Sequence, residues 1–163
     1  MHISLQQLIP NDWQLLLGDY LESPAWQQLC EAFEQEHKVY GIKIRPDKDK
    51  LFYALQLTPL DSVKVILLGQ DPYHGVYKDN KNINHPQATG LAFSVPKECP
   101  LPPSLKNIYE NQLKFKRINF IPKHVCLDYL AYQGVLLLNT SLTVEKSKPN
   151  SHQSIWNIFT DEL

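Results

Sequence analysis

The chain has 163 residues, of which 43% are hydrophobic and 20% are charged, with 16 Lys and Arg against 17 Asp and Glu. This length corresponds to one domain that can bury a core without disulfides or a structural metal. The composition excludes a disordered chain and a coiled coil. The near-neutral charge excludes a protein that coats nucleic acid by bulk electrostatics, so any polyanion site must be local.

Cysteine usage and hydropathy favour an intracellular protein. Cys30, Cys99 and Cys126 are odd in number and far apart, which indicates unpaired thiols that are most simply read as small buried side chains. The apolar runs at 65–68 and 135–138 are far shorter than the roughly 20 residues of a membrane span. No signal peptide is evident at the start. We expect no membrane association and a cytoplasmic location, or a nuclear one in a eukaryote.

The first half of the chain predicts two helices. Ser23-Pro24 is a typical helix start, and the apolar spacing that follows predicts a helix ending before Gly41. A second helix is predicted to start at Asp47 and to stop before Pro59. Its apolar side would carry Leu51, Phe52, Ala54 and Leu55. Both helices are expected to be structural.

The rest of the chain predicts alternating strands and helices. The apolar runs at 63–69 and 134–139 do not alternate with polar residues, which predicts strands covered on both faces, as in a parallel sheet. Residues 91–95 form a shorter candidate strand, Pro103-Ser104 opens a helix to about Lys114, and 127–133 predict a further helical turn. This order favours an α/β fold, a three-layer sandwich with a central parallel sheet flanked by helices.

Polar residues follow both predicted buried strands. Gln70-Asp71 comes after the first and Asn139-Thr140 after the second. Because the carboxyl ends of parallel strands lie at the same edge, where ligands bind, we expect a carboxylate and an amide to converge on one pocket. Near them, residues 78–84 are polar and lack periodicity, which predicts a mobile surface loop.

Residues 69–75, Gly-Gln-Asp-Pro-Tyr-His-Gly, concentrate chemistry at that edge. Gly and Pro alone would indicate a turn, and an Asp before Pro is more often structural than catalytic. A carboxylate, an aromatic ring and an imidazole together are instead typical of a binding site.

The segment 65–75 resembles the water-activating loop of the family 1 uracil-DNA glycosylases. Four further segments resemble that family in the same order: 90–95 its base-stacking strand, 102–109 its proline-rich DNA-compressing loop, 133–140 its uracil-reading strand, and 151–161 the segment after it. The resemblance extends over nearly the whole chain from about Trp13. It implies hydrolysis of the N-glycosidic bond of a flipped-out uracil in DNA, the first step of base-excision repair.

The resemblance also implies the role of each residue at the centre of the site. Asp71 would be the general base that orients water and stabilises the cationic sugar. Phe93 would stack on the flipped base, although without the family it would be read as a core residue. The amide of Asn139 would read the uracil edge. Tyr73 would be the wall that excludes the methyl group of thymine, which an accommodating pocket discriminates poorly.

Six further residues are implied to lie around the base and the DNA backbone. Gln70 would offer backbone contacts to the base. Ser104, preceded by Pro103, would bind a DNA phosphate at a helix start, or would simply cap the helix. The remaining residues expected near the DNA backbone or the water are His74, Ser151 and His152.

No cofactor is expected. The six histidines show no metal-ligand spacing, the phosphate-binding glycine motifs are absent, and the implied reaction needs only water. A site of His74, His85 and Asp71 can be imagined but has a low prior. The expected partners are uracil-containing DNA, single- or double-stranded, and possible proteinaceous glycosylase inhibitors, with the protein acting as a monomer.

The sequence departs from the family at its end. Family members continue past Phe159-Thr160-Asp161 into a further parallel strand and a His-Pro-Ser-Pro-Leu-like loop that stabilises the leaving uracil. We therefore expect residues 1–163 to be a single glycosylase-like domain that is C-terminally incomplete. The histidine of that loop donates a hydrogen bond to O2 of the uracil in the family, and loss of one such donor typically costs about 10²–10³ in rate. The alternatives are an impaired or inactive remnant that binds DNA weakly, or a nucleotide- or sugar-processing protein that uses Asp71 in an analogous pocket.

Smaller departures lie inside the chain. Thr89 stands where the family usually has histidine, Leu130 replaces a usual tryptophan, and the insert between Gly75 and Pro86 lengthens the loop. We expect Thr89 to alter the hydrogen bonds around Asp71.

Overall fold

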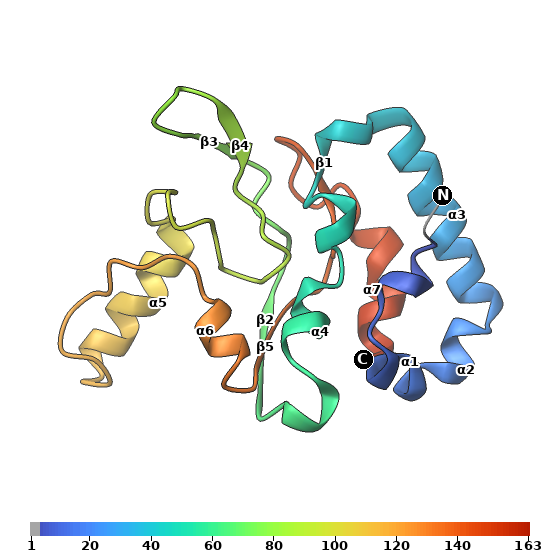
Figure 1. Ribbon diagram of the computed structural model, residues 1–163, viewed down its shortest axis with the longest axis horizontal. Coiled ribbons are helices and arrows are strands. Elements are labelled where there is room, and N and C mark those ends of the chain that lie inside the picture. Colours follow the sequence, from blue (N-terminus) through green and yellow to red (C-terminus); the bar gives the residue numbers. More distant parts are fainter. Residues whose placement is uncertain (1–3) are drawn as a thin grey trace.

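A computed structural model describes residues 4–163 (Figure 1). Residues 1–3 lie outside the described part, so the start expected to lack a signal peptide is described only from Ser4 onward. No helix within residues 4–163 has the length and hydropathy that a bilayer span requires. The helices are α1 (Asn11–Leu16), α2 (Gly18–Leu21), α3 (Pro24–Tyr40), α4 (Tyr53–Leu57), α5 (Pro103–Lys114), α6 (Asp128–Ala131) and α7 (Gln153–Glu162). The strands are β1 (Ile44–Arg45), β2 (Val65–Gly69), β3 (Val76–Lys78), β4 (Asn84–Pro86), β5 (Val135–Asn139) and β6 (Val144–Glu145).

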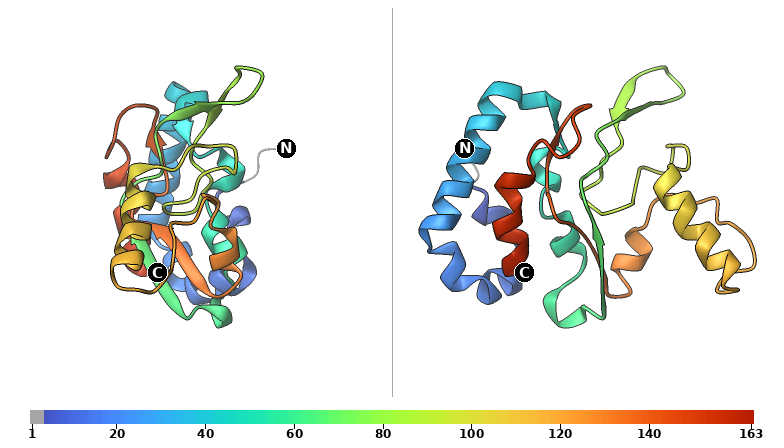
Figure 2. Two further views of the ribbon diagram at one scale, coloured as in Figure 1. Left: turned by 90° about the vertical axis from the view of Figure 1, so that its left-hand side faces the viewer. Right: turned by 180° about the vertical axis from the view of Figure 1, so that it is seen from behind.

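Strands β2 and β5 form the parallel pair at the centre of the molecule. Their register runs from Val65 opposite Val135 to Gly69 opposite Asn139. Helices α5 and α6 lie on one side of this pair, while α4, α7 and the N-terminal helices lie on the other (Figures 1 and 2). The predicted α/β class is thereby confirmed, with the parallel strands between two groups of helices.

The predicted helices follow their sequence punctuation. Ser23 caps α3 by accepting a hydrogen bond from the backbone N–H of Trp26 at 3.3 Å, and Gly41, with φ of 42°, ends the helix. The boundaries predicted for α5 are those observed. The helix predicted from Asp47 is instead a short 3-10 turn, Lys48–Lys50, followed by α4.

An aromatic cluster packs α7 against α3 and the segment before α4. The rings of Phe33 and Trp156 lie 5.8 Å apart between centroids, and those of Phe52 and Phe159 lie 5.6 Å apart. All four side chains are fully buried, or nearly so. Large edge-to-face aromatic contacts of this kind fix both the position and the rotation of a short helix. Helix α7 is therefore firmly anchored below the strand ends.

The strand predicted at 91–95 was wrong. These residues form a turn, in which Phe93 has φ of 63° and Gly90 has φ of 88°. A chain with left-handed residues at these two positions cannot run as an extended ladder. Instead, Ala92 donates one backbone hydrogen bond, 3.0 Å long, to the carbonyl of Leu137 in β5.

The expectation of strands covered on both faces was right for β5 and wrong for β2. Residues 136–139 of β5 are buried, whereas Val65, Ile66 and Leu68 of β2 are 55%, 55% and 57% exposed. Within residues 4–163, β5 is the only strand that pairs with β2, so the other edge of β2 faces solvent.

The surface loop predicted at 78–84 is, over residues 79–83, the turn of a β-hairpin whose strands include Lys78 and Asn84. Strands β3 and β4 pair antiparallel, with Tyr77 opposite His85. The Asp79 carboxylate accepts backbone hydrogen bonds from Lys81 and Ile83 and lies 3.0 Å from the ring of His85. The bond from Ile83 is the largest cause of the lowered pKa of Asp79, followed by His85. Polar side chains thus close the hairpin turn, which hydrophobic periodicity does not reveal.

Candidate active site

The carboxyl ends of β2 and β5 lie side by side and bring two polar dipeptides together. Beyond the paired residues, the N–H of Thr140 donates to the carbonyl of Gly69 at 2.9 Å, and that of Ser141 donates to the carbonyl of Gln70 at 3.0 Å. Gln70-Asp71 and Asn139-Thr140 therefore share one edge, as the parallel arrangement predicts.

A cavity of about 290 Å³ opens at this edge. It is smaller than a second cavity of about 690 Å³ beside α6, but only this one has the sheet-edge carboxylate and amide in its wall. Of the predicted site residues, Pro103, Ser151 and His152 do not line it. Its lining residues are Gly69, Gln70, Asp71, Pro72, Tyr73, His74, Leu91, Phe93, Ser104, Asn139 and Pro149.

Gly69 makes room for the amide of Asn139. A Cβ atom at position 69 would stand 2.3 Å from Oδ1 of Asn139 and 3.0 Å from the Cβ of Ala92. The Asn139 side chain is 5% exposed. The amide thus lies against the end of the neighbouring strand, which restricts its rotation. Such a restriction is what an amide needs in order to distinguish a donor-acceptor edge from its reverse.

Asp71 combines one satisfied oxygen with one free oxygen. Its Oδ2 accepts a 2.6 Å hydrogen bond from the backbone N–H of Asn150. Its Oδ1 is buried and has no hydrogen-bond partner within residues 4–163. Buried carboxylate oxygens are rarely left without a donor, because the lost hydration is costly. The Asn150 contact therefore orients the carboxylate, and Oδ1 is its acceptor that has no donor within residues 4–163.

Tyr73 joins three segments around the cavity. Its hydroxyl lies 2.6 Å from Oγ of Ser104, at the start of α5, and 3.5 Å from the carbonyl oxygen of Phe93. Burial raises the pKa of Tyr73, so the phenol is neutral. The alternative reading of Ser104 as a helix cap is not observed, because the N-cap is Pro102 and no side chain caps it. The Ser104 hydroxyl is instead hydrogen-bonded to the hydroxyl of Tyr73.

Phe93 lines the cavity from a strained backbone. A φ of 63° is unusual for a bulky residue, and such residues are concentrated at binding sites. The turn is held on both sides: Thr89 Oγ1 donates to the carbonyl of Ser94 at 3.3 Å, and Ser94 Oγ accepts from the N–H of Leu127 at 2.9 Å. Gly90 lies so close to the 3-10 turn before α4 that a Cβ there would meet the Lys50 carbonyl at 2.2 Å.

Two site residues were missed by sequence reasoning. Pro149 lines the cavity, and Asn150 holds both Asp71 and the side chain of Gln70, whose Nε2 donates to Oδ1 of Asn150 at 2.6 Å. Asn150 has φ of 64°, a conformation that Asn tolerates well. The Lys148-Pro149-Asn150 turn signal was the available clue, but it does not reveal what the turn contacts.

His152 is buried away from the cavity. Its Nδ1 lies 2.8 Å from Oγ1 of Thr143, which also accepts a 2.6 Å hydrogen bond from Nε1 of Trp156. Its Nε2 lies 3.6 Å from a carboxylate oxygen of Glu36. Burial lowers the pKa of His152 and outweighs the opposite effect of Glu36. The structure thus gives the ring a structural environment.

The other residues expected near DNA are distributed around the cavity. Ser151 is exposed, and its Oγ accepts a 2.8 Å hydrogen bond from the N–H of Glu145. His74 is exposed, and its carbonyl accepts from the N–H of Ser147 at 3.2 Å. The DNA contacts of Ser151, His152 and His74 stay predictions. Within residues 4–163, no group of three or more His, Cys, Asp or Glu side chains is placed to hold a metal ion.

Comparison with known proteins finds similar proteins that carry the name uracil-DNA glycosylase. No family model matches the chain. A Coxiella burnetii protein named uracil-DNA glycosylase is 45% identical over 152 residues, which are 93% of this chain and 63% of the relative. The chain is homologous to the uracil-DNA glycosylases. It spans less than two-thirds of the length of that relative, and the family resemblance expected from its motifs is confirmed over the shared part.

Solved structures of uracil-DNA glycosylases have the same fold. The crystal structure of the mimivirus uracil-DNA glycosylase superposes with a TM-score of 0.88 and is 31% identical, covering 98% of this chain and 56% of that one. A variant of the mimivirus enzyme in complex with UGI gives a TM-score of 0.87 at 31% identity, covering 98% of this chain and 58% of that one. The arrangement of β2, β5 and the surrounding helices is therefore that of the glycosylases.

Proposed function

We propose that this protein removes uracil from DNA by hydrolysing the bond between the base and deoxyribose. The observation that carries the proposal is the pair at the strand ends: a carboxylate with one free, buried oxygen, Asp71, beside the confined amide of Asn139. The homology to uracil-DNA glycosylases supports the same reading.

The proposed reaction uses water and the residues of the cavity. A uracil turned out of the DNA stack lies against Phe93 and presents its polar edge to Asn139. The Asp71 carboxylate accepts a hydrogen bond from a water molecule, and its negative charge stabilises the sugar as it becomes cationic. The C1′–N1 bond breaks, the water oxygen bonds to C1′, and the water proton passes to Asp71. Uracil leaves with the bonding electrons, and an abasic site remains.

Tyr73 supports a preference for uracil over thymine. Thymine differs only by a methyl group, and a yielding apolar pocket separates such ligands by about 1–3 kcal/mol. The Tyr73 ring is held through its hydroxyl by Ser104 and the Phe93 carbonyl. A wall fixed at its far end resists displacement, so it excludes the methyl group more strongly than a mobile side chain would.

Asp71→Asn tests the proposal directly. We expect uracil release to fall by about 10²-fold or more, since loss of a general base costs about 10²–10⁴ in rate. The measurement is single-turnover release of uracil from a uracil-containing oligonucleotide in EDTA, followed by cleavage of abasic sites. A thymine-only oligonucleotide is the substrate control. Asp61→Asn, which changes an exposed carboxylate in the turn before β2, is the variant control and should be fully active.

Two results would decide against the proposal. One is equal strand breakage in the uracil and thymine oligonucleotides, and the other is no release from either. Binding of DNA without release would favour the alternative of a non-catalytic DNA-binding protein.

We also propose that a proteinaceous glycosylase inhibitor binds this protein. The support is the mimivirus enzyme, whose structure was solved with UGI. Addition of UGI should stop uracil release at a stoichiometric amount, and continued release in its excess would contradict the proposal.

A further inference from the structure

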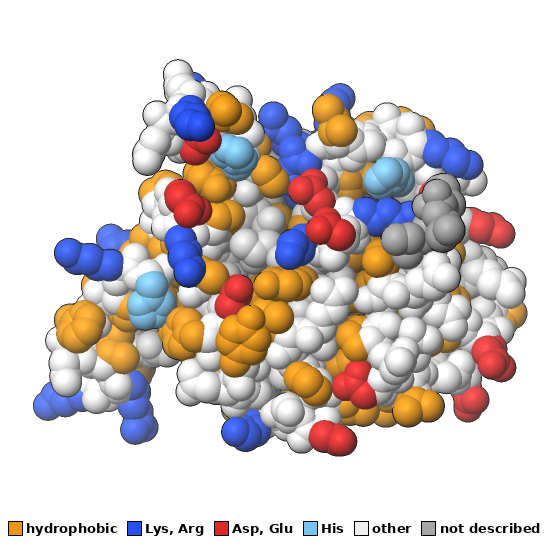
Figure 3. Space-filling model, viewed as in Figure 1, with side chains coloured by type: hydrophobic (Ala, Val, Ile, Leu, Met, Phe, Trp, Pro, Cys, Tyr) orange, Lys and Arg blue, Asp and Glu red, His pale blue; other side chains and the backbone are white. Residues whose placement is uncertain are grey.

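A basic and aromatic surface projects from the end of α5, away from the candidate active site. Between Glu110 and Asp128 the chain carries four cationic side chains and no carboxylate. Residues 111–117 are all exposed. In Figure 3 this end of the molecule, where Figure 1 shows α5, carries basic side chains around hydrophobic ones. We call it the α5 surface and define it as Lys114, Phe115, Lys116, Arg117, Phe120 and Lys123.

The aromatic rings of the α5 surface are not used in packing. Phe115 is 66% exposed and Phe120 is 72% exposed. Lys114 lies with its Nζ 5.8 Å from the centre of the Phe115 ring. Large apolar side chains that gather in solvent within a polar rim mark an interaction site. Lys114 also complements the helix dipole at the end of α5, but Lys116, Arg117 and Lys123 lie beyond the helix and have no such role.

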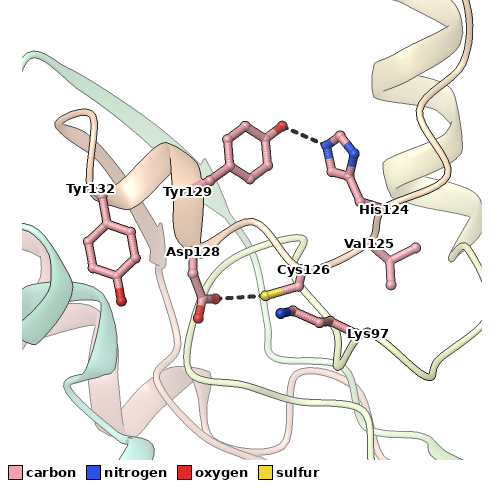
Figure 4. Close-up of a pocket in the computed structure, with 7 residues that line it drawn as sticks. All are labelled: Lys97, His124, Val125, Cys126, Asp128, Tyr129 and Tyr132. Carbon is pink, nitrogen blue, oxygen red and sulfur yellow. Dashed lines mark hydrogen bonds between the residues drawn. The ribbon is translucent and has the colours of Figure 1, made fainter.

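The cavity of about 690 Å³ is lined by residues that directly follow the α5 surface in the chain (Figure 4). His124, which follows Lys123, lies in its wall, and the Nε2 of His124 is 3.0 Å from the hydroxyl of Tyr129. Tyr132 is 70% exposed at the other side of the opening. Lys97 adds a cation to the wall and Asp128 a carboxylate, which accepts a 3.1 Å hydrogen bond from Sγ of Cys126. The volume is within the range of small-ligand sites and would accommodate a nucleobase between aromatic and polar groups.

Together these features match one kind of ligand. Exposed rings offer faces on which bases stack, and interspersed Lys and Arg neutralise phosphates, which is the combination that binds single-stranded nucleic acid. We infer that the α5 surface and the adjoining cavity bind a single-stranded nucleic acid segment, with bases against Phe115, Phe120 and the cavity tyrosines. This inference goes beyond the proposed function and does not depend on uracil, because every base has a face that can stack.

The charge distribution explains why such a site is local. The whole chain has a net charge of −1, so the surface as a whole does not attract a polyanion. The stretch from 111 to 127 is by contrast purely cationic. This end of the molecule therefore offers local charge complementarity to a phosphate backbone, and salt should weaken binding there steeply.

Fluorescence anisotropy with a labelled thymine-only oligonucleotide of about 20 nucleotides, longer than common single-strand site sizes, tests the inference. We expect the double variant Phe115→Ala, Phe120→Ala to weaken binding by about 5-fold or more for each ring. The double variant Lys116→Gln, Arg117→Gln should lower the salt slope of log K by about 1.4, the value for two lost phosphate contacts in a single strand.

Matched controls lie on the opposite side of the molecule. Ile42→Ala replaces an apolar side chain that is 91% exposed, and Lys38→Gln with Lys43→Gln removes two exposed cations near α3. These variants should bind the oligonucleotide as the unmodified protein does. All altered residues are exposed, so thermal unfolding of each variant should be unchanged.

Three outcomes would overturn the inference. They are no binding of the oligonucleotide by the unmodified protein, equal losses in the α5 surface variants and the controls, and loss of binding to anionic lipid vesicles but not to the oligonucleotide. The last would identify a membrane surface instead. Uracil release from a short substrate separates the two proposals: if release is absent while the α5 surface variants still lose oligonucleotide binding, only the proposed function fails.

Discussion

At the end of β2, the absence of a side chain at Gly69 positions the amide that would read the base. The β2–β5 register places Asn139 directly opposite, and any Cβ at 69 would overlap its Oδ1. A strand glycine with a neighbouring group so close is there for that approach rather than for its flexibility. The specificity attributed to Asn139 therefore depends equally on position 69.

Gly69→Ala should displace Asn139 and thereby damage uracil release more than it damages folding. We expect single-turnover release to fall by about 10-fold or more, because misplaced binding groups a fraction of an ångström away lose much of their effect. Gly18→Ala is the matched control, since nothing lies within 4 Å of a Cβ at that helical position. It should be neutral or stabilising by up to about 1 kcal/mol. Full activity of Gly69→Ala would show that Asn139 is not held by this contact.

Individual residues of the candidate site were predictable to different degrees. Asp71 and Asn139 stand at the ends of uninterrupted apolar runs, and strand ends in a parallel sheet meet, so their convergence follows from the pattern alone. Asn150 acts on Asp71 from a turn 79 residues further along the chain, and no local signal reports such a contact. The free Oδ1 of Asp71 is likewise a property of the assembled site.

At the scale of elements, prediction succeeded where the sequence carries residues that start or end a helix. Helix α3 starts at Ser23-Pro24 and ends at Gly41, and α5 starts after two prolines. The strand prediction at 91–95 failed because a phenylalanine in left-handed backbone has no signature in sequence. The turn that these residues form is held by the hydrogen bond between Thr89 and Ser94.

The segment from Thr143 to His152 is tied to α7 by buried polar contacts. Trp156 donates to the Thr143 hydroxyl, which in turn can donate to Nδ1 of a neutral His152. The lowered pKa of His152 agrees with this hydrogen bond, because it means that the ring is uncharged in the folded protein. This segment carries Asn150, so the packing of His152 supports the orientation of Asp71 from a distance.

Stability should consequently fall in acid. Below the ordinary histidine pKa of about 6.5, the unfolded chain binds a proton at His152 while the folded chain resists it, so the free energy of unfolding decreases as pH falls. Urea denaturation between about pH 7 and pH 5 should show this decrease. In His152→Gln the decrease should be smaller, although the variant is less stable throughout. An identical pH dependence in His152→Gln would contradict the assignment.

At the scale of the whole molecule, the two central strands differ in how far the rest of the chain buries them. The class and the parallel pair were predictable because uninterrupted apolar runs are typical of parallel sheets. The burial of each strand was not predictable. The same pattern describes both β5, which is buried, and β2, whose outer residues are more than half exposed. Periodicity reports the residue types of a strand and not its neighbours.

The same substitution in the two strands should have very different effects. Leu137→Ala, in a fully buried position, should cost about 2–5 kcal/mol in the free energy of unfolding, whereas Leu68→Ala, at 57% exposure, should cost less than about 1 kcal/mol. Urea denaturation of both variants provides the comparison. Similar losses would mean that the outer face of β2 is covered in solution, for example by association of chains.

Helix α5 fixes the distance between the candidate active site and the α5 surface. Ser104 stands in its first turn beside the candidate active site, and the α5 surface begins at its last residue, Lys114. Twelve residues at 1.5 Å each make the helix about 18 Å long. A single strand whose bases stay stacked at the duplex spacing of about 3.4 Å per nucleotide covers this length in about five nucleotides. Oligonucleotides that extend at least that far to one side of the uracil can reach both ends of the helix, and shorter ones can reach only one.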